Sequence, residues 1–470
     1  MAAEFVVVAN RLPVDRVVGA DGEETWRTSP GGLVAALEPV MHGVEGAWVG
    51  WAGQADVKLA PFTANDIRLI PVALSAQEVA EYYEGFANDT IWPLYHDVIS
   101  APQFHREWWE AYRTVNRRFA AAAADAVAPG GTVWVHDYQL QLVPEMVREL
   151  RPDVTIGYFH HIPFPAHNLF AQLPWRDQVL RGLLGADVVG FQRAQDAASF
   201  SAAVKRRLRY EVKASTVNVP QESGSTRSVL VKAFPISIDT VPYIELASRP
   251  DVQARAAEIR ASLGNPKRIL LGVDRLDYTK GIRHRIKAYG ELLADGTLPV
   301  EDATLIQVAS PSRERVDAYV HLRDEIELLV SRINGDNDTV GHSAIRYLHQ
   351  GFPREEMVAL YLAADVMLVT ALRDGMNLVA KEYVATRADN RGVLVLSEFT
   401  GAADELRSAV RVNPHDIEGL KEAILVAVEM TPAEQGRRMR ALRRRVIEHD
   451  VTAWSNSFLA ALAAVRRTHA

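Results

Sequence analysis

Short runs of β-branched and other apolar residues recur along the chain and alternate with longer segments of helical character. Long helical stretches lie, for example, at 104–127 and 313–334. Strands that are apolar throughout are typical of a sheet covered on both faces, and alternation of strand and helix favours parallel strands. The sequence therefore predicts an α/β fold. The expected strands are 5–9, 133–136, 156–159, 188–191, 269–273, 304–309, 366–369 and 393–396.

A chain of 470 residues exceeds the size at which one hydrophobic core usually keeps growing. Pro235, Pro242 and Pro250 interrupt any long periodic element between the two sets of strands. We therefore expect a first domain over 1–238 and a second over 239–451. An amphipathic helix at 452–470 is expected to pack back on the first domain.

Composition excludes several classes of protein. The chain has no cysteine, which removes disulfide scaffolds, thiolate metal sites and cysteine nucleophiles. A net charge of −7 argues against nucleic-acid binding, which favours basic chains. The first residues resemble no signal peptide, and no apolar stretch approaches the ~20 residues of a membrane helix. We expect no membrane association and a cytoplasmic protein.

Loops after the expected strands of the first half carry polar side chains. In open parallel sheets ligands bind at the carboxyl ends of strands. Arg11 follows the first strand, and Asp137 and His161 follow two later ones. Gly31 and Gly32 precede a helical pattern, where their backbone suits an anion, although such a pair is as often only a turn. A metal pair at His160 and His161 is disfavoured, because adjacent strand residues point to opposite faces.

The second half places cations after two of its strands. Arg275 and Lys280 follow 269–273, and Arg313 follows 304–309. Two cations at one strand end suit a diphosphate. The alternative is a structural ion pair of Arg275 with Asp274 or Asp277. No G-x-G-x-x-G follows the first strand and no P-loop occurs, which argues against a dinucleotide oxidoreductase or a P-loop enzyme.

An Asp-Gly turn at Asp374 leads into a helix after strand 366–369. The free N–H groups of such a helix start suit phosphate, and Glu382, about two turns on, suits a ribose diol. An exposed helix residue is the alternative for Glu382. Among the aromatic residues, Trp51, Tyr83 and Trp92 lie near turn-rich segments and are the better candidates for stacking on a sugar. Core packing explains most of the other aromatic residues.

Taken together, these motifs resemble the trehalose-6-phosphate synthases. That family consists of retaining glucosyltransferases of GT-B architecture, with two Rossmann-like doubly wound domains facing a central cleft. The resemblance runs from residue 5 to about 460. It rests on Ala9-Asn-Arg-Leu-Pro13, Ser29-Pro-Gly-Gly-Leu33, Trp134-Val-His-Asp-Tyr138, His161-Ile-Pro-Phe-Pro165, Asp274-Arg-Leu-Asp-Tyr-Thr-Lys-Gly281 and Arg373-Asp-Gly-Met-Asn-Leu-Val-Ala-Lys-Glu-Tyr383.

The resemblance implies a role for each matching position. Acceptor phosphate and sugar would be bound by Arg11, Tyr83, Trp92, Asp137 and Arg313, and we add Trp51 to this acceptor set as an aromatic candidate from its position in the sequence. The donor would be bound by Gly31, Gly32, His161, Arg275, Lys280, Asp374, Met376, Asn377, Leu378, Val379 and Glu382. Asp137, His161, Arg275, Lys280 and Asp374 would form the catalytic set. The loop at 16–27 looks variable within the family, which puts its role in closing over the acceptor in doubt.

The implied reaction transfers glucose from UDP- or GDP-glucose to glucose 6-phosphate with retention, without a metal or other cofactor. The sequence does not distinguish the two nucleobases, and it leaves open whether the chain forms a homo-oligomer. Two alternatives stay open. One is transfer to another phosphorylated acceptor, such as glycerol phosphate or an aminocyclitol phosphate. The other is a catalytically silent homologue that senses sugar phosphates, although such a protein is expected to have lost part of the catalytic set.

Overall fold

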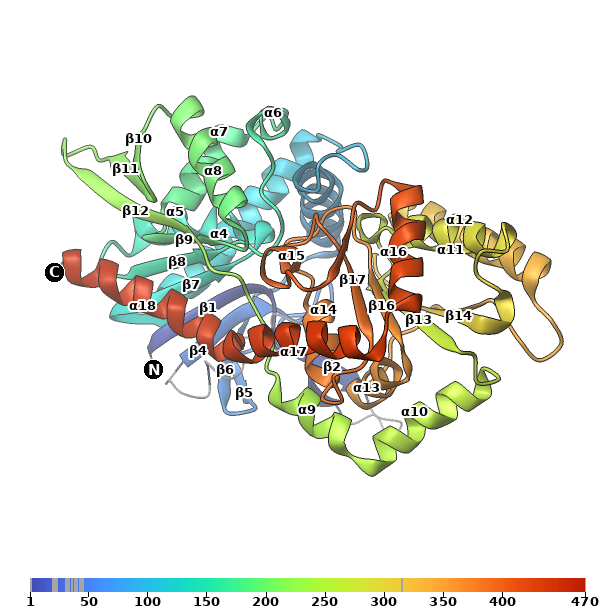
Figure 1. Ribbon diagram of the computed structural model, residues 1–470. Helices are drawn as coiled ribbons and strands as arrows, with labels where there is room; N and C mark the ends of the chain where they lie inside the picture. The colour runs from blue at the N-terminus through green and yellow to red at the C-terminus, as the bar shows by residue number, and fades with distance from the viewer. Residues whose placement is uncertain are drawn as a thin grey trace. The chain divides into compact units, whose positions relative to one another are not determined.

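The computed structural model describes residues 2–18, 24–29, 34, 37, 41, 46–313 and 316–469 (Figure 1). The chain divides into two compact units. Unit 1 comprises Met1–Ile236 and Val451–Ala470, and unit 2 comprises Ser237–Asp450. All eight strands expected from the sequence are present in the structure.

Unit 1 is built on a ten-stranded sheet in the order β10-β11-β12-β9-β8-β7-β1-β4-β6-β5. Its strands from β12 to β6 run parallel, while β10–β11, β11–β12 and β5–β6 are antiparallel pairs. The first strand, β1, lies between β7 and β4, so the chain order reverses there. The bounds are β1 (Ala3–Arg11), β4 (Gly46–Trp51), β5 (Phe62–Ala64), β6 (Ile67–Pro71), β7 (Val127–His136), β8 (Thr155–Phe159), β9 (Val188–Phe191), β10 (Glu211–Lys213), β11 (Thr216–Pro220) and β12 (Thr226–Ala233).

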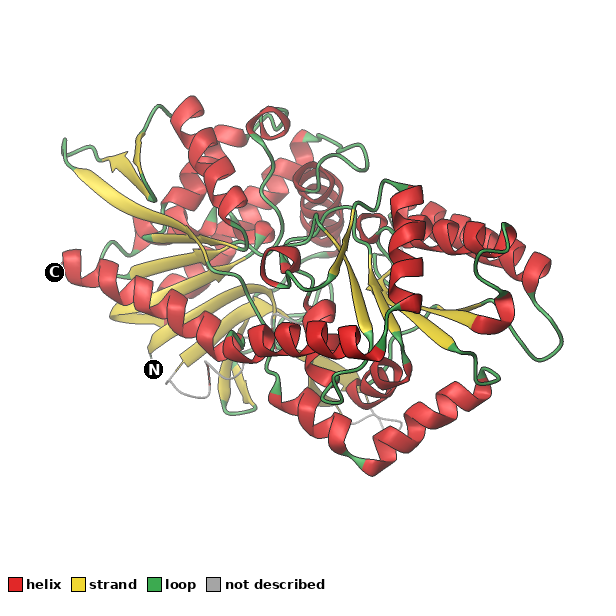
Figure 2. Ribbon diagram, viewed as in Figure 1, coloured by secondary structure: helices red, strands yellow, loops and turns green. Residues whose placement is uncertain are grey.

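Helices and one hairpin complete unit 1 (Figure 2). The hairpin pairs β2 (Val14–Val18) with β3 (Glu24–Thr28). The helices are α2 (Ala76–Glu78), the π-helix η1 (Val79–Ile91), α3 (Trp92–Tyr95), α4 (Arg106–Ala126), η2 (Tyr138–Leu140), α5 (Val143–Leu150), α6 (His167–Phe170), α7 (Arg176–Leu184), α8 (Ala194–Arg207) and α18 (Val451–His469). The sequence analysis missed β2 to β6 and β10 to β12, because these strands are short or lack a continuous apolar run.

The last helix, α18, packs on strands of unit 1. The ring of Phe458 stacks on Trp134 with 4.6 Å between ring centroids and also meets Phe234. Glycine in the strands makes room for it, since a Cβ at Gly157 or Gly190 would lie 2.8 or 2.7 Å from the Phe458 ring. The helix thus covers a face that is otherwise apolar.

Unit 2 contains a six-stranded sheet in the order β15-β14-β13-β16-β17-β18, and all its pairs are parallel. Its first strand, β13, lies between β14 and β16, which is a topological switch point. The strands are β13 (Arg268–Arg275), β14 (Ala303–Ser310), β15 (Ile345–Leu348), β16 (Val366–Val369), β17 (Val393–Ser397) and β18 (Val410–Val412).

Helices pack against both faces of this sheet. Leu270 and Leu368 belong to one core with α11, α12 and α16, whereas the neighbouring Leu271 and Met367 are buried outside that core. Alternation along a strand sends these two sets to opposite faces. The helices are α9 (Val241–Ser248), α10 (Pro250–Ser262), α11 (Ile282–Ala294), α12 (Asp317–Asn337), α13 (Arg354–Ala363), α14 (Leu378–Thr386), α15 (Ala402–Glu405), α16 (Ile417–Glu429) and α17 (Pro432–Glu448), with short turns η3 (Tyr278–Lys280) and η4 (Val300–Asp302). The expected α/β fold with parallel sheets is therefore confirmed.

Candidate active site

A cavity of about 370 Å³ opens in unit 1 beside the carboxyl ends of β1 and β7. Arg11, Tyr83 and Asp137 line it, together with residues that the sequence analysis had not selected: Asn10, Asp15, Ser29, His136 and Gln139. Tyr82 donates its hydroxyl to Asn10 Oδ1 over 2.7 Å in the buried interior, which fixes the orientation of that amide. The cavity lies at the switch point of this sheet, where ligands of parallel α/β sheets bind.

Arg11 is held at the rim of this cavity by three neighbours. Its Nη2 lies 2.9 Å from Asp15 Oδ1, and its guanidinium carbon lies 5.2 Å from the centroid of the Trp51 ring. Gly53 has φ of +89°, and a Cβ there would lie 2.2 Å from Arg11 Nη2. Glycine suits this left-handed backbone, and a side chain at this position would push the end of the Arg11 side chain away. The guanidinium is therefore placed by an acidic, an aromatic and a backbone neighbour.

Trp51 and Trp92 are each 5% exposed, and neither is among the described residues that line the cavity. Trp51 packs beside Tyr83, with 5.9 Å between ring centroids, and so supports two residues of the lining. Trp92 packs on His96 and Tyr138. Gly31 and Gly32, the pair expected to approach the donor, lie outside the described residues, as does the middle of the loop at 16–27.

Asp137 has an unusual backbone conformation, with φ of 73° and ψ of 170°. This region is populated almost only by glycine and costs other residues about 1–3 kcal/mol. Two hydrogen bonds hold the residue there, because Asp137 Oδ1 accepts from the backbone N–H of Tyr138 at 2.9 Å and of His161 at 3.2 Å. The second bond ties the end of β7 to the loop after β8. Strain at a cavity wall is typical of a functional position.

His161 lies against a second imidazole. His136 Nδ1 and His161 Nε2 are 3.1 Å apart. Burial lowers the pKa of His161 to about 3 and that of His136 well below its ordinary value. Both rings are consequently neutral at physiological pH.

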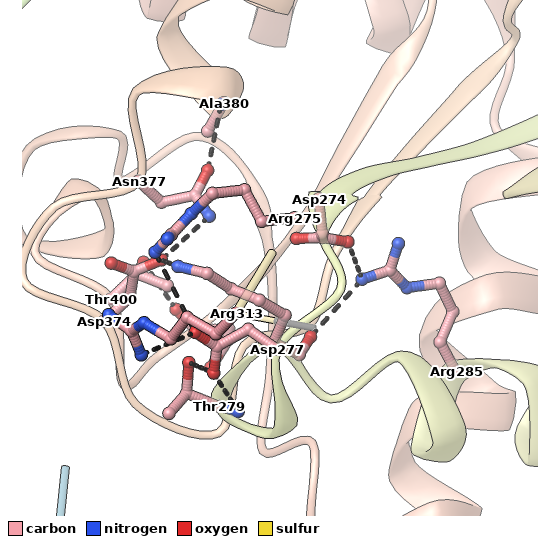
Figure 3. A network of polar contacts seen from close by, with 12 residues as sticks. Asp274, Arg275, Asp277, Thr279, Arg285, Arg313, Asp374, Asn377, Ala380 and Thr400 are labelled. Carbon is pink, nitrogen blue, oxygen red and sulfur yellow. Dashed lines mark hydrogen bonds and ion pairs between the residues drawn. The ribbon is translucent and has the colours of Figure 1, made fainter. Parts of the chain in front are cut away.

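In unit 2 the expected cations meet at the carboxyl ends of β13 and β16 (Figure 3). Lys280 Nζ lies 2.6 Å from Asp374 Oδ2, although 94 residues separate the two in sequence. The side chain of Asn377 donates to the same carboxylate oxygen at 3.1 Å. Asn377 also caps α14 in a left-handed conformation, where its Oδ1 accepts from the backbone N–H of Ala380. Lys280, Asp374 and the start of α14 thus form one cluster, next to the buried Met376 and the first helical residues Leu378 and Val379.

Asp277 forms ion pairs with both Arg275 and Arg313. It is fully buried, and its Oδ2 lies 3.8 Å from Arg275 and 3.6 Å from Arg313. Burial alone raises the pKa of a carboxyl group, but Arg313, Arg275, Lys280 and the backbone N–H of Thr279 together outweigh it and lower the pKa of Asp277. Arg275 Nη1 also donates to Ser312 Oγ at 3.4 Å. The structural ion pair considered for Arg275 therefore exists, and it orients both cations.

Arg285 is a central residue that the sequence analysis did not select. Its side chain is fully buried and donates to Asp274 Oδ2 at 2.8 Å, to Thr370 Oγ1 at 3.0 Å and to Gln307 Oε1 at 3.1 Å. It also approaches the carbonyl oxygen of Lys280 at 3.4 Å. Figure 3 shows Arg285 and Asp274 facing each other beside the cluster around Asp374. Arg285 therefore links the end of β13 and the turn that carries Lys280 to β14 and to Thr370, the residue that follows β16.

Glu382 is partly buried on α14 and is not the exposed helix residue considered as its alternative. The hydroxyl of Tyr361 donates to its Oε2 at 2.8 Å. Burial raises its pKa, and this effect exceeds the opposing effects of Tyr361, Tyr243 and Arg354. The carboxyl group is thus fixed by tyrosine hydroxyls about one turn from the start of α14 at Leu378.

No group of three or more histidine, aspartate or glutamate side chains in the described residues is arranged to hold a metal ion, and the chain has no cysteine. No helix in the described ranges has the length and apolar character to cross a membrane.

Known proteins are similar to this chain over nearly its whole length. The family model described as glycosyltransferase family 20 matches residues 3–464. The trehalose-6-phosphate synthase of Mycobacterium avium (strain 104) is 56% identical over 469 residues, covering 98% of this chain and 95% of that protein.

Solved structures are similar over nearly the whole chain. The UDP-forming α,α-trehalose-phosphate synthase from Burkholderia xenovorans, in complex with glucose-6-phosphate, is 31% identical with a TM-score of 0.88 and covers 98% of this chain and 99% of its own. A trehalose-6-phosphate protein from E. coli, bound with UDP-2-fluoro glucose, is 32% identical with a TM-score of 0.88, at 97% and 98% coverage. On the sequence match and these structures together, the chain belongs to glycosyltransferase family 20.

Proposed function

We propose that this glycosyltransferase is an α,α-trehalose-6-phosphate synthase, which transfers glucose from a nucleoside diphosphate glucose to glucose 6-phosphate with retention of configuration. The observation that carries the proposal is the presence of positive side chains at both sheet switch points. Arg11 lines the cavity of unit 1, and Arg275 and Lys280 lie at the switch point of unit 2. Both substrates of this reaction carry phosphate. The mycobacterial relative bears this name, and the solved relatives were obtained with glucose-6-phosphate and with UDP-2-fluoro glucose.

Unit 2 is the proposed donor domain. Arg275 and Lys280 would bind the diphosphate, which becomes the leaving group. Negative charge grows on that group in the transition state, so preorganised cations there contribute strongly to the rate. Glu382, fixed by Tyr361, would accept hydrogen bonds from the ribose hydroxyls. Asp374, the N–H groups of residues 376–379 and the pair Gly31 and Gly32 complete the proposed donor contacts.

Unit 1 is the proposed acceptor domain. Arg11 would bind the phosphate of glucose 6-phosphate, and Tyr83 and Asp137 would contact the sugar within the same cavity. Trp51 would act by supporting Arg11, and Trp92 and Arg313 are assigned to the acceptor through the family resemblance. His161 would contact the transferred glucose.

The proposed chemistry is a same-face transfer. The acceptor hydroxyl oxygen forms a bond to the anomeric carbon of glucose while the bond from that carbon to the diphosphate oxygen breaks, and the hydroxyl proton passes to the departing diphosphate. Double displacement would need a carboxylate nucleophile in addition to the residue that contacts the acceptor. Arginine and lysine neutralise the diphosphate, so we propose that the reaction needs no metal ion. We also propose that it takes place in the cytoplasm.

The test is a panel of nucleoside diphosphate glucoses against several phosphorylated acceptors, with nucleoside diphosphate release and the disaccharide product both measured. We expect turnover with glucose 6-phosphate and the same rate after EDTA treatment. Consumption of glycerol phosphate or an aminocyclitol phosphate without use of glucose 6-phosphate would refute the assignment of the acceptor. No release with any pair would favour a sensing protein, and a rate abolished by EDTA and restored by a divalent cation would refute metal independence.

A further inference from the structure

Two imidazole rings touch at the carboxyl ends of β7 and β8. His136 is the last residue of β7, and His161 follows the end of β8 by two residues. His136 is fully buried, and its Nδ1 lies 3.1 Å from His161 Nε2. On its other side the ring packs against Trp134, with 4.6 Å between centroids. The contact therefore joins a buried histidine to the histidine proposed to touch the transferred sugar.

The two nitrogens are within hydrogen-bond distance, and burial lowers the pKa of both rings so that both are neutral, which calls for one N–H between them. A neutral imidazole has one N–H and one nitrogen lone pair. Two arrangements are possible. Either His136 Nδ1–H donates to His161 Nε2, or His161 Nε2–H donates to His136 Nδ1. In each arrangement, the protonation of the two nitrogens in contact, His136 Nδ1 and His161 Nε2, also decides whether the other nitrogen of each ring carries a proton.

The far nitrogen of His136 distinguishes the two arrangements. His136 Nε2 is buried and has no hydrogen-bond partner among the residues that the structure describes. The second arrangement would place a buried N–H there with no acceptor among those described residues, whereas the first leaves only a lone pair. Buried N–H groups without a partner are rarer in proteins than incompletely satisfied acceptors, and a lost donor bond is costly.

We infer that His136 sets the tautomer of His161: His136 donates from Nδ1, His161 accepts at Nε2, and His161 carries its own proton on Nδ1. His136 is thus a positioning residue, and His161 presents a neutral N–H donor suited to a sugar hydroxyl oxygen. The inference rests on the proposed function for the identity of that hydroxyl. It also means that His161 has no ring lone pair left to take the proton of the acceptor hydroxyl. That proton goes to the departing diphosphate instead.

Long-range ¹H–¹⁵N NMR on the histidine-labelled protein tests the tautomers without any turnover. We expect a pyridine-like ¹⁵N shift for Nε2 and a pyrrole-like shift for Nδ1 in both rings, and a coupling across the hydrogen bond between His136 Nδ1 and His161 Nε2. Signals are assigned with His136→Asn and His161→Asn, and the exposed His321→Asn serves as control. Pyrrole-like Nε2 in the two rings would overturn the inference, whether or not the protein proves to be a synthase.

Kinetics of two His136 variants test the positioning role. His136→Phe removes the donor, and we expect kcat to fall about tenfold, the effect of losing one good hydrogen bond. In the His136→Phe variant, the ¹⁵N shifts of His161 are expected to become those of the Nε2–H tautomer. Asparagine places an amide N–H near the position of Nδ1, so His136→Asn should keep most of kcat and the Nδ1–H tautomer of His161. Equal kcat in the Phe and Asn variants, or an unmoved His161 signal in the Phe variant, would contradict the role. Circular dichroism separates either result from misfolding.

Discussion

Replacing Arg285 by methionine is expected to destabilise unit 2 by about 3–5 kcal/mol, the usual cost of removing one partner from a buried ion pair. Arg285 is fully buried, and the loss leaves Asp274 buried without its guanidinium partner. Thr370, Gln307 and the carbonyl of Lys280 lose a donor as well. Methionine occupies a similar volume, so the loss is mainly electrostatic rather than the result of a cavity.

Urea unfolding measures this loss unit by unit, because all nine tryptophans lie in unit 1. Tryptophan fluorescence therefore reports unit 1, and far-UV circular dichroism reports both units. With an m-value of about 3 kcal/mol/M, the expected loss lowers the midpoint of the unit 2 transition by about 1–2 M. The circular dichroism signal should show this lower midpoint for unit 2, whereas the midpoint from tryptophan fluorescence should shift less than the midpoint from circular dichroism. A shift below about 0.3 M would refute the reasoning.

The pH dependence of the same variant identifies the group responsible. Burial raises the pKa of Asp274 even beside Arg285, and loss of Arg285 removes an influence that lowers it. A carboxyl group whose folded-state pKa exceeds its unfolded value destabilises the fold above that pKa. The deficit of Arg285→Met should consequently shrink as the pH falls through the folded-state pKa. Adding Asp274→Asn should recover part of the stability at neutral pH, whereas an equal deficit in single and double variants would show that the buried charge is not the cause.

Three further changes test separate parts of the molecule. Lys280→Met should lower kcat about 10²–10³-fold, because it removes a preorganised contact to the transition state. The control is Lys287→Met at an exposed position, which should leave kcat unchanged. Equal kcat in the two variants would argue against the diphosphate role of Lys280. Phe458→Ala should cost about 3–5 kcal/mol and lower the urea midpoint seen by tryptophan fluorescence; an unshifted midpoint would mean that α18 contributes little to unit 1. Gly53→Ala should displace the Arg11 guanidinium. KM for glucose 6-phosphate should therefore rise while KM for the donor stays constant. A change in KM for the donor alone would contradict the placement of Arg11.

Features set by local pattern were predictable from the sequence. Apolar runs identified strands such as Val366–Val369, and the rule that ligands bind at strand ends selected Arg11, Lys280 and Asp374. The partnership of Lys280 with Asp374 was not predictable from spacing, because it depends on β13 and β16 being neighbours in the sheet.

Other features depend on burial, which no local pattern shows. Arg285 lies in a helix whose sequence, Ile-Arg-His-Arg-Ile-Lys, reads as a solvated basic stretch, yet its side chain is completely enclosed. Gly53 is needed because the guanidinium of Arg11, remote in the sequence, lies against it. Trp51 supports the Arg11 side chain and does not line the cavity among the described residues. In each case the decisive neighbour is remote in the sequence.

The packing of α18 on unit 1 has a consequence for synthesis on the ribosome. The strands β7, β8 and β9 are translated long before the helix that covers them, and all of unit 2 is made in between. Until then Trp134, Phe234 and the strand glycines that leave room for Phe458 stay uncovered. Unit 2 is contiguous in the chain and completes its own core first. The nascent protein therefore exposes an apolar surface throughout the synthesis of its second half, and release of the last helix from the ribosome ends that exposure.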